Sequence, residues 1–282
     1  MDLKEIVVVG AGAMGSGIAQ VAAISGFTVT MIDVNPAQLQ KARAGIRDSA
    51  ERLHAKGRLS DEQRAAIGKI NTAEDLSVAA GGDIVIEAAS EHPQLKEKIF
   101  AELDEVARSG VILATNTSSI SITLIAAATQ RPDKVVGMHF FNPVPLMKLV
   151  EIVRGLATSD QTTATAVALS EALGKTLVET NDSPGFISNR ILCPMLNEAI
   201  YALMEGVGTP EAIDAVMKLG MNHPMGPLEL CDLVGIDVLL HVMEVLHRDL
   251  GEDKYRLCPL LRKMVAAGRL GRKTGRGFYE YV

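Results

Sequence analysis

One histidine and one glutamate stand in an apolar stretch of the chain and could carry out proton transfer. They are His139 and Glu151, and phenylalanine, valine, leucine and methionine occupy most of the positions around them in residues 137–152. A carboxylate beside an imidazole orients the ring and favours its charged form, which suits a general acid–base pair. The alternative is a core histidine satisfied by the backbone, with the glutamate at the surface.

Two short apolar runs are expected to position this pair. Residues 134–140 and 148–153 are predicted to be strands, with a proline-containing turn between them. His139 and Glu151 are equidistant from Pro145. If the strands pair antiparallel around that turn, the two side chains lie opposite or nearly opposite each other. A different loop conformation would shift this register.

A glycine-rich segment near the start of the chain predicts a dinucleotide site. Gly10, Gly12 and Gly15 give the pattern Gly-x-Gly-x-x-Gly directly after a predicted strand at residues 5–9, and a helical pattern follows. These glycines permit a tight turn, close approach of a pyrophosphate to a helix N-terminus, and close helix–strand packing. Asp33, after the next predicted strand, would accept hydrogen bonds from ribose hydroxyls and repel a 2′-phosphate, which favours NAD over NADP. The alternative is a cluster of packing glycines without a ligand.

Polar residues follow two further predicted strands. Glu91 comes shortly after a buried run at residues 82–89, and an Asn-Thr-Ser-Ser segment follows residues 111–114. Ligands of open α/β sheets bind at the carboxyl ends of the strands, so these residues are candidate contacts. Ser118 in this segment could equally cap the short helix expected next, and for Ser119 the cap is the favoured interpretation.

A long helix expected over residues 36–56 carries a basic face in an otherwise acidic chain. Ser49, Arg52 and Lys56 follow the i, i+3, i+7 spacing and share one face of this helix. Such a face suits a polyanionic ligand such as the phosphates of coenzyme A. On sequence alone, a solvated helix face is the more common explanation.

The composition limits the partners and compartments to be considered. The 282 residues are 48% apolar and carry a net charge of −6, which gives no reason to expect nucleic acid or an anionic membrane. The three cysteines show no Cys-x-x-Cys spacing, so neither a disulfide framework nor a metal site is expected. Residues 6–32 lack charge but contain five glycines, which favours a strand, turn, helix and strand over a membrane span or signal peptide. A cytoplasmic protein without a membrane partner is expected.

The order of predicted elements defines the fold class. Strands and helices alternate up to about residue 180. Four helices are then expected, at residues 187–204, 209–219, 227–250 and 259–267. We therefore expect an α/β fold: a Rossmann-type, mostly parallel sheet domain at residues 1–184, with a helical insertion at about 36–68, followed by a smaller all-α domain at 185–282. The second domain is so apolar that it is expected to bury one face against a second subunit, which would make a homodimer.

Six motifs in this order carry a family resemblance that runs from the first strand to the last tyrosine. They are Gly10-Ala-Gly-Ala-Met-Gly, Asn116-Thr-Ser-Ser, His139-Phe-Phe-Asn-Pro-Val-Pro, Asp182-Ser-Pro-Gly-Phe-Ile-Ser-Asn-Arg, Pro224-Met-Gly-Pro and Lys273-Thr-Gly-Arg-Gly-Phe-Tyr. The chain resembles the L-3-hydroxyacyl-CoA dehydrogenase family, in particular its short bacterial members that act on 3-hydroxybutyryl-CoA. The resemblance implies an NAD-dependent oxidoreductase of fatty acid metabolism that acts on the CH–OH group of an acyl-CoA. It also implies that the C-terminal domain serves substrate binding and dimerisation.

The resemblance assigns roles to individual residues. His139 would be the catalytic acid–base and Glu151 its partner. Ser118 and Asn189 would contact the reacting end of the substrate. The cofactor contacts would be Gly10, Ala11, Gly12, Ala13, Met14, Gly15, Asp33, Glu91, Lys96, Ser118, Asn142 and Lys273. The acyl-CoA contacts would be Ser49, Lys56 and Ser118. This last assignment reverses the preference for a solvated face on the long basic helix.

Two other functions are open at this stage. One is a related two-domain hydroxyacid dehydrogenase with a substrate that lacks coenzyme A, for which the basic helix would have no use. The other is a non-catalytic NAD-binding protein built on the same scaffold. The presence of His139, Glu151, Ser118 and Asn189 argues against it, because such a protein needs no proton-transfer pair.

Overall fold

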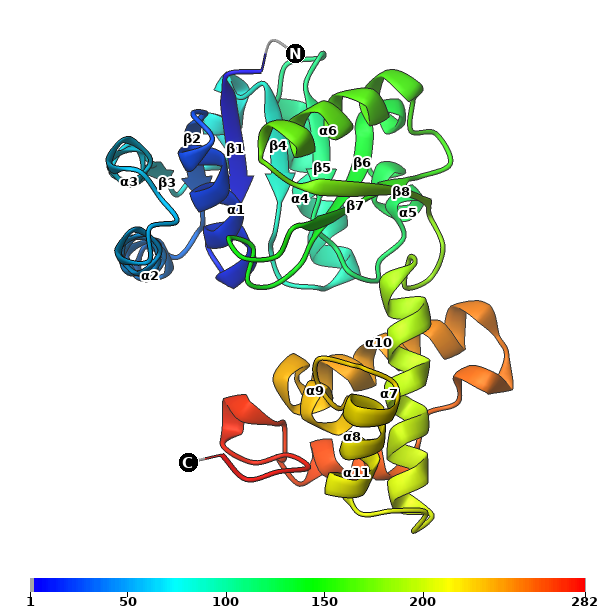
Figure 1. Cartoon of the computed structure of the whole chain (residues 1–282). Helices are drawn as coiled ribbons and strands as arrows, with labels where there is room; N and C mark the ends of the chain where they lie inside the picture. The colour runs from blue at the N-terminus through cyan, green and yellow to red at the C-terminus, as the bar shows by residue number, and fades with distance from the viewer. Residues whose placement is uncertain (1–2, 282) are drawn as a thin grey trace. The chain divides into compact units, whose positions relative to one another are not determined.

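The computed structural model describes residues 3–281 of the chain (Figure 1). They form two compact units, one up to Asp182 and one from Ser183 onward, beside the expected boundary after residue 184. The first unit contains the whole sheet and the second is built of helices (Figure 1). The expected fold class, an α/β unit followed by a smaller all-α unit, is therefore confirmed.

Eight strands form one sheet, in the spatial order β3-β2-β1-β4-β5-β6-β7-β8. The strands are β1 (Glu5–Val9), β2 (Thr28–Ile32), β3 (Asn71–Ala73), β4 (Ile84–Glu87), β5 (Ile112–Thr115), β6 (Val135–Phe140), β7 (Leu149–Arg154) and β8 (Thr176–Asn181). Neighbouring strands pair parallel, except for the antiparallel pair of β6 and β7. The strand order reverses between β1 and β4, and open α/β sheets bind ligands outside the carboxyl ends of the strands at such a position.

Helices of the first unit connect these strands and cover the sheet (Figure 1). They are α1 (Ala13–Ile24), α2 (Pro36–Ala55), α3 (Asp61–Ile67), the 3₁₀ turn η1 (Leu76–Gly81), α4 (Pro93–Val106), α5 (Ile122–Ala126), the 3₁₀ turn η2 (Pro132–Lys134) and α6 (Asp160–Ala172). The uncharged run at residues 6–32 forms the core of β1, α1 and β2, so it folds as a strand–helix–strand unit. Within residues 3–281, the search for a helix with the length and apolar character of a membrane span found none.

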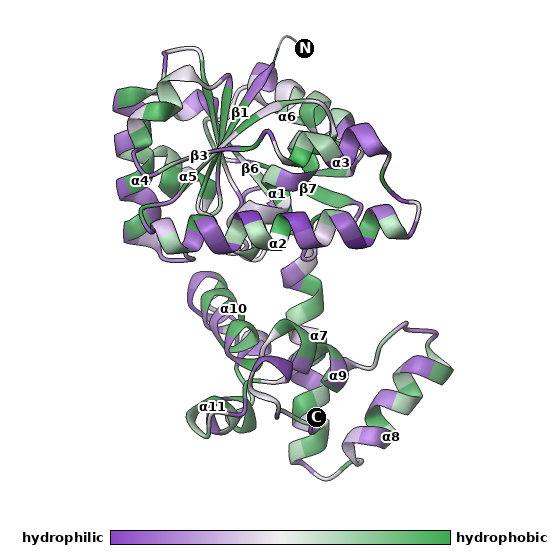
Figure 2. Ribbon diagram, turned by 90° about the vertical axis from the view of Figure 1, so that its left-hand side faces the viewer, coloured by the Kyte–Doolittle hydropathy of each residue, from purple (hydrophilic) through white to green (hydrophobic). Residues whose placement is uncertain are grey.

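The two helices of the insertion, α2 and α3, lie between β2 and β3 in the chain. Asn35 caps α2, since its side chain accepts hydrogen bonds from the amides of Ala37 and Gln38. Ser60 and Gln63 form a capping box at the start of α3. The buried residues of α2 recur at helical spacing and pack the helix against the rest of the first unit; they are Leu39, Ala42, Ile46, Ala50 and Leu53. Hydrophilic residues alternate with them along the ribbon in Figure 2.

The second unit is an array of short and long helices. They are α7 (Ser188–Met204), α8 (Pro210–Ala215), the π-helical turn η3 (Val216–Gly220), α9 (Pro227–Val234), α10 (Ile236–Leu250), the 3₁₀ turn η4 (Asp253–Tyr255), α11 (Pro259–Ala266) and the 3₁₀ turn η5 (Arg272–Thr274). The single helix expected over residues 227–250 is wrong. The chain breaks it at Gly235, whose φ of 105° lies outside the helical region and is accessible mainly to glycine.

Two buried aspartates hold the C-terminal segment against this helical array. Asp232 accepts hydrogen bonds from the amides of Phe278 and Tyr279, at 2.9 Å each, and from the Tyr281 hydroxyl at 3.0 Å. Asp214 accepts from the Tyr279 hydroxyl at 2.8 Å. The glycine-rich end of the chain is therefore an ordered part of the second unit.

Candidate active site

The candidate acid–base pair is formed by facing residues of two antiparallel strands. The register of β6 and β7 sets His139 directly opposite Glu151, which is the arrangement expected from their equal distance to Pro145. Nδ1 of the imidazole lies 2.7 Å from Oε2 of the carboxylate. Both residues are buried, with 7% and 2% of their surface exposed. Because an ionised carboxylate only accepts hydrogen bonds, this contact requires a hydrogen on Nδ1 and directs proton exchange to Nε2.

A second polar cluster lies at the carboxyl end of β5. The Glu91 atom Oε1 accepts hydrogen bonds from the Thr117 hydroxyl at 2.6 Å and from the Ser118 amide at 2.8 Å and hydroxyl at 3.1 Å. It also accepts from the amide and hydroxyl of Ser119, at 3.1 and 3.2 Å. The expectation that Ser119 caps the next helix is wrong, because this carboxylate binds its hydroxyl and Ser121 caps α5.

Lys96 lies beneath this cluster, with 1% of its surface exposed. Its ammonium is 2.6 Å from Oε1 of Glu87 and 3.5 Å from Oε2 of Glu91. Burial raises the pKa of the Glu91 carboxyl, but the Lys96 ammonium and the hydrogen bonds from Thr117 and Ser118 outweigh it and hold the pKa below its ordinary value. The carboxylate that faces the two serines is therefore kept ionised.

The glycine loop has the shape that a pyrophosphate requires. Gly10 has a φ of 99°, and a Cβ on it would lie 2.7 Å from the Ala88 carbonyl oxygen. A Cβ on Gly15 would overlap the Gly10 carbonyl oxygen, which shows how closely α1 packs against the loop. A Cβ on Gly12 would meet nothing within 4 Å, so the backbone faces open space at the start of α1. This opening fits a phosphate that approaches the helix N-terminus.

Asp33 supports the same loop from the end of β2. Its Oδ2 accepts a hydrogen bond from the Ala11 amide at 2.8 Å, and its Oδ1 accepts from the Asn35 amide at 2.9 Å. The Ala11 carbonyl in turn accepts from the Gln38 side chain at 2.7 Å. The carboxylate is thus fixed beside the loop, and Ala13 and Met14 follow in the first turn of α1.

The remaining predicted site residues are distributed over three elements. Asn142 is exposed in the segment between β6 and β7. Ser49 lies on the partly exposed side of α2, and Lys56 is its C-cap. In the second unit, Lys273 pairs with Asp237 at 2.7 Å between Nζ and Oδ2.

Asn189 lies in the first turn of α7, also in the second unit. The thiol of Cys193, one turn later, lies 3.8 Å from its Oδ1. Sequence reasoning did not single out this cysteine as a neighbour of a predicted site residue. The i, i+4 spacing on a predicted helix was the available signal.

Sequence reasoning also missed Glu87, the fully buried partner of Lys96. The available signal was a single acid that ends the otherwise apolar strand β4. Charged residues are almost never fully buried unless they are paired, so an acid in such a position indicates a polar network.

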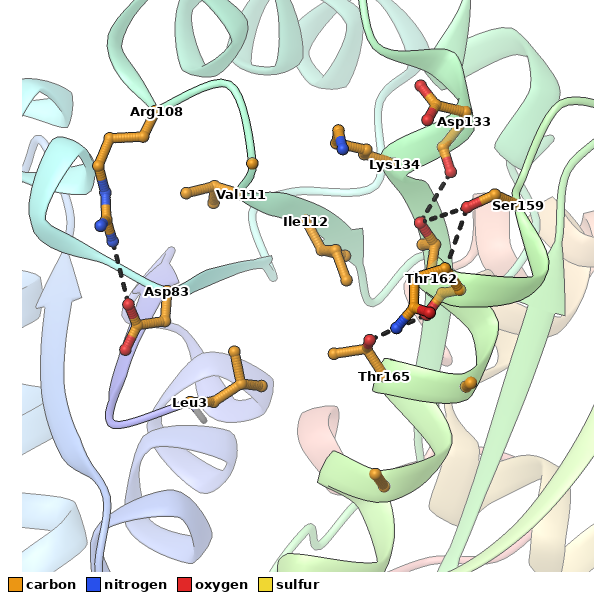
Figure 3. Close-up of a pocket in the computed structure, with 14 residues that line it drawn as sticks. Leu3, Asp83, Arg108, Val111, Ile112, Asp133, Lys134, Ser159, Thr162 and Thr165 are labelled. Atoms are coloured by element: carbon orange, nitrogen blue, oxygen red, sulfur yellow. Dashed lines mark hydrogen bonds and ion pairs between the residues drawn. The ribbon is translucent and has the colours of Figure 1, made fainter. Parts of the chain in front are cut away.

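A cavity of the first unit lies at the other end of the sheet. It has a volume of about 780 Å³ and is lined by residues near the starts of strands, among them Asp83, Ile112 and Lys134, and by one side of α6 (Figure 3). The Asp83–Arg108 ion pair visible there ties the start of β4 to the end of α4, with 3.0 Å between the charged atoms. The glycine loop, Glu91 and Ser118 follow the carboxyl ends of the strands, so this cavity is separate from the candidate site.

A search of residues 3–281 for metal-binding groups of His, Cys, Asp and Glu found none.

Comparison with known proteins agrees with the two-part organisation of the chain. Residues 5–183 match the NAD binding domain of 3-hydroxyacyl-CoA dehydrogenase, and residues 185–281 match its C-terminal domain. The chain is 56% identical over 282 residues to a probable 3-hydroxybutyryl-CoA dehydrogenase of Bacillus subtilis, with 100% of this chain and 98% of the relative covered. It is 52% identical over 280 residues to the 3-hydroxybutyryl-CoA dehydrogenase of Bradyrhizobium diazoefficiens, with 99% and 96% covered.

Solved structures show the same likeness. The crystal structure of (S)-3-hydroxybutyryl-CoA dehydrogenase from Ralstonia eutropha superimposes with a TM-score of 0.96 at 51% identity, covering 100% of both chains. The family resemblance expected from the six sequence motifs is thereby confirmed. The chain belongs to the 3-hydroxyacyl-CoA dehydrogenase family, and its first unit is the NAD-binding domain of that family.

Proposed function

We propose that the protein interconverts (3S)-3-hydroxybutyryl-CoA and acetoacetyl-CoA with NAD as the redox partner. The observation that carries this proposal is the 2.7 Å contact between His139 and Glu151 in the NAD-binding domain of this family. Relatives named for this reaction align with the whole chain at more than half identity, which supports the choice of substrate.

The NAD-binding groups proposed here are the glycine loop, Asp33 and the polar residues beyond it. Gly12 leaves room for the pyrophosphate, and Asp33 is held where it would accept from the adenosine ribose. Further proposed contacts are Glu91, Lys96, Ser118, Asn142 and Lys273. When bound, NAD supplies the acceptor for the hydride that leaves C3 of the substrate.

His139 is proposed to move the proton. In the oxidation direction the neutral ring takes the proton of the 3-hydroxyl at Nε2, while Glu151 holds Nδ1 and stabilises the imidazolium that forms. In the reduction direction the same nitrogen donates the proton. Ser118 and Asn189 are proposed to hydrogen-bond the C3 oxygen or the thioester carbonyl, and positioning of this kind can supply several kcal/mol of barrier reduction, about 7 or more in favourable cases.

The coenzyme A moiety is proposed to contact the basic side of α2. Ser49 and Lys56 share one face of this helix. Ser49 is partly exposed beside the packed residues Ile46 and Leu53, and Lys56 is exposed at the C-cap. Cationic and hydroxyl side chains spread along one helix face suit the several phosphate groups of such a ligand. This contact would make the enzyme select a CoA ester over the free acid.

The assay that tests the activity follows NADH absorbance with acetoacetyl-CoA at neutral pH. We expect NADH to be consumed, free acetoacetate to give little turnover, and NADPH to be used poorly because Asp33 would repel its 2′-phosphate. Failure to oxidise NADH with acetoacetyl-CoA and with longer 3-oxoacyl-CoA esters would reject the proposal. Equal use of NADPH and NADH would contradict only the role of Asp33 and would leave the proposed reaction standing.

The second unit is proposed to form a homodimer. Several large apolar side chains of this unit are well exposed, and an isolated chain gains by burying them against a second copy; they are Ile191, Val207, Val216, Leu219 and Met221. Light scattering is expected to give about twice the chain mass of 30.0 kDa. A monomer at micromolar concentration would contradict this. We also propose a cytoplasmic location, which the three free cysteines support, and a role in fatty acid metabolism, which the family supports. Cell fractionation with an antibody tests the compartment.

A further inference from the structure

Glu87 is a buried carboxylate at the point where the strand order of the sheet reverses. It is the last residue of β4, and it pairs in register with Val9 of β1 and Thr115 of β5. None of its surface is exposed. Three donors reach it: the Ala89 amide at 2.6 Å, the Lys96 ammonium at 2.6 Å and the Thr115 hydroxyl at 2.7 Å. The proposed proton transfer uses none of these four groups directly.

The first connection from Glu87 runs through Lys96. The Lys96 ammonium lies between Oε1 of Glu87 and Oε2 of Glu91. With 1% of the residue exposed, its proposed contact with NAD is confined to a small area, and both of its ionic partners are protein carboxylates. The other oxygen of Glu91 receives the hydroxyls of Thr117 and Ser118. Besides its own proposed contact with NAD, Lys96 therefore holds Glu91 in place, and Glu87 holds Lys96.

The second connection runs through Thr115. Its hydroxyl donates its single hydrogen to Oε2 of Glu87, which leaves a lone pair that accepts from the Thr117 amide at 3.2 Å. Both connections thus end in the loop at residues 117–119: Thr115 binds the Thr117 amide, and Glu91 binds hydroxyls of the loop and the amides of Ser118 and Ser119. A carboxylate that only balanced the Lys96 charge would need neither of these endpoints.

We propose that Glu87 is a positioning residue that fixes Glu91 and Ser118 for NAD and for the reacting end of the substrate. This rests on the proposed function for the roles of those two residues. Buried ion pairs contribute little net stability compared with apolar residues of similar volume, whereas loss of one partner leaves an uncompensated charge. Removal of the Glu87 charge leaves the Lys96 ammonium with Glu91 alone and draws that carboxylate away from the hydroxyls it holds.

The main test is Glu87→Gln, which keeps the size of the side chain and removes its charge. We expect NADH affinity, measured by fluorescence titration, to fall about tenfold, as for loss of a hydrogen bond to a charged group. We expect kcat with acetoacetyl-CoA to fall by a similar factor of about ten, and KM for the ester to stay within about twofold, because the coenzyme A contacts lie on α2.

A matched control removes a mostly buried ion pair at the other end of α4, the helix that carries Lys96. Asp104 of α4 pairs with Arg131 at 2.5 Å, and both side chains are about nine-tenths buried, with 10% and 12% exposed. Asp104→Asn should lower the melting temperature without changing NADH affinity or kcat. If Glu87→Gln lowers stability but leaves both quantities at the wild-type value, as Asp104→Asn does, Glu87 is only a structural residue and the proposal is wrong.

Two further variants separate the connections and keep the test informative if Glu87→Gln does not fold. Thr115→Val removes one connection with little change in shape, and it should weaken NADH binding in the same direction but less. Combined with Lys96→Met, Glu87→Gln should add little to the loss caused by Lys96→Met alone, because both act along one connection. An unchanged NADH affinity in Thr115→Val and full additivity in the double variant would each contradict the proposal. The NADH titration needs no turnover, so it stands even if acetoacetyl-CoA proves not to be a substrate.

Discussion

His139 and Glu151 show how far sequence reasoning reaches at the scale of single residues. Their equal distance from Pro145 predicted facing positions on two strands, and the register of β6 and β7 sets them directly opposite each other. The prediction was possible because the two strands follow each other in the chain, joined only by residues 141–148, so the pairing is local. The sequence left the alternative of a surface glutamate open, and the 2.7 Å contact closes it.

Loss of the His139 imidazole is expected to abolish most turnover while NADH still binds. In His139→Gln, kcat should fall by about 10²–10⁴, the range typical for removal of a general acid–base, because no group then exchanges the substrate proton. NADH affinity should stay within about twofold. Absorbance assays and fluorescence titration give the two quantities.

His54→Gln is the matched control for that variant. His54 also contacts a carboxylate, with 3.1 Å between its Nε2 and Oδ1 of Asp61, but on the surface of the insertion. It should keep a wild-type kcat. A near-normal kcat in His139→Gln would show that another group is the acid–base.

Glu87 and Ser119 were beyond the same reasoning, for a physical reason. Their partners come from other strands and helices, such as Lys96 on α4 and Glu91 in the segment that precedes it, and side-chain pairing across a parallel sheet leaves no periodic signal. A serine hydroxyl near a helix start can either accept from the first amides of the helix or donate to a distant carboxylate, and only the packed structure decides between the two.

At the scale of elements, local patterns predicted the strands and the glycine turn of the first unit, but not the break between α9 and α10. Buried parallel strands are continuous apolar runs, as in β1 and β4. The glycine loop is recognisable because its backbone geometry requires glycine at fixed positions. Gly235 stands in an apolar helical pattern, and a single glycine is compatible with a continuous helix at a cost of about 1 kcal/mol. Its φ of 105° follows from packing, which the pattern does not contain.

The contact between α1 and the glycine loop is expected to tolerate no side chain at Gly15. A methyl group there would overlap the Gly10 carbonyl oxygen, so the loop must shift. In Gly15→Ala, the free energy of unfolding should fall by about 1–3 kcal/mol, as for overpacked cores, and NADH affinity should fall with it. Urea unfolding and fluorescence titration measure the two effects.

Gly45→Ala provides the comparison on a helix that has room. Gly45 lies in the middle of α2, and a Cβ on it would meet nothing within 4 Å. The higher helix propensity of alanine should raise the free energy of unfolding by about 0.5–1 kcal/mol. A Gly15→Ala protein as stable as Gly45→Ala would mean that the close packing in the loop has no energetic weight.

At the scale of the whole molecule, the sequence predicted that an all-helical part follows the last strand. The spacing of apolar residues changes there from that of strands to that of helices, and turn residues mark the change. It did not predict how the second unit holds its last residues. Asp214 and Asp232 bind the C-terminal segment from helices that lie some 45 or more residues earlier in the chain. In the sequence, each aspartate resembles an ordinary surface residue. Only the folded structure shows that both are buried, with 2% of their surface exposed or less.

The second unit also contains all three cysteines of the chain, each of them buried. Burial raises the pKa of the Cys193 thiol to about 12, and the pKa of Cys231 and of Cys258 is raised for the same reason. An unfolded chain releases these protons near pH 9.0, whereas the folded chain keeps them. Above that pH the unfolded state therefore binds fewer protons than the folded state, and alkali favours unfolding.

The free energy of unfolding should consequently fall as pH rises from 9 toward 12. One thiol that titrates only when unfolded contributes a slope of about 1.4 kcal/mol per pH unit in this window. Urea unfolding at pH 8, 9, 10 and 10.5 measures the slope, and Cys193→Ala should make it shallower even though the variant starts from a lower stability. The slope, rather than the level, separates the thiol from the small cavity that the substitution creates. An identical slope in wild type and Cys193→Ala would show that the thiol at position 193 ionises as readily in the folded unit as in the unfolded chain.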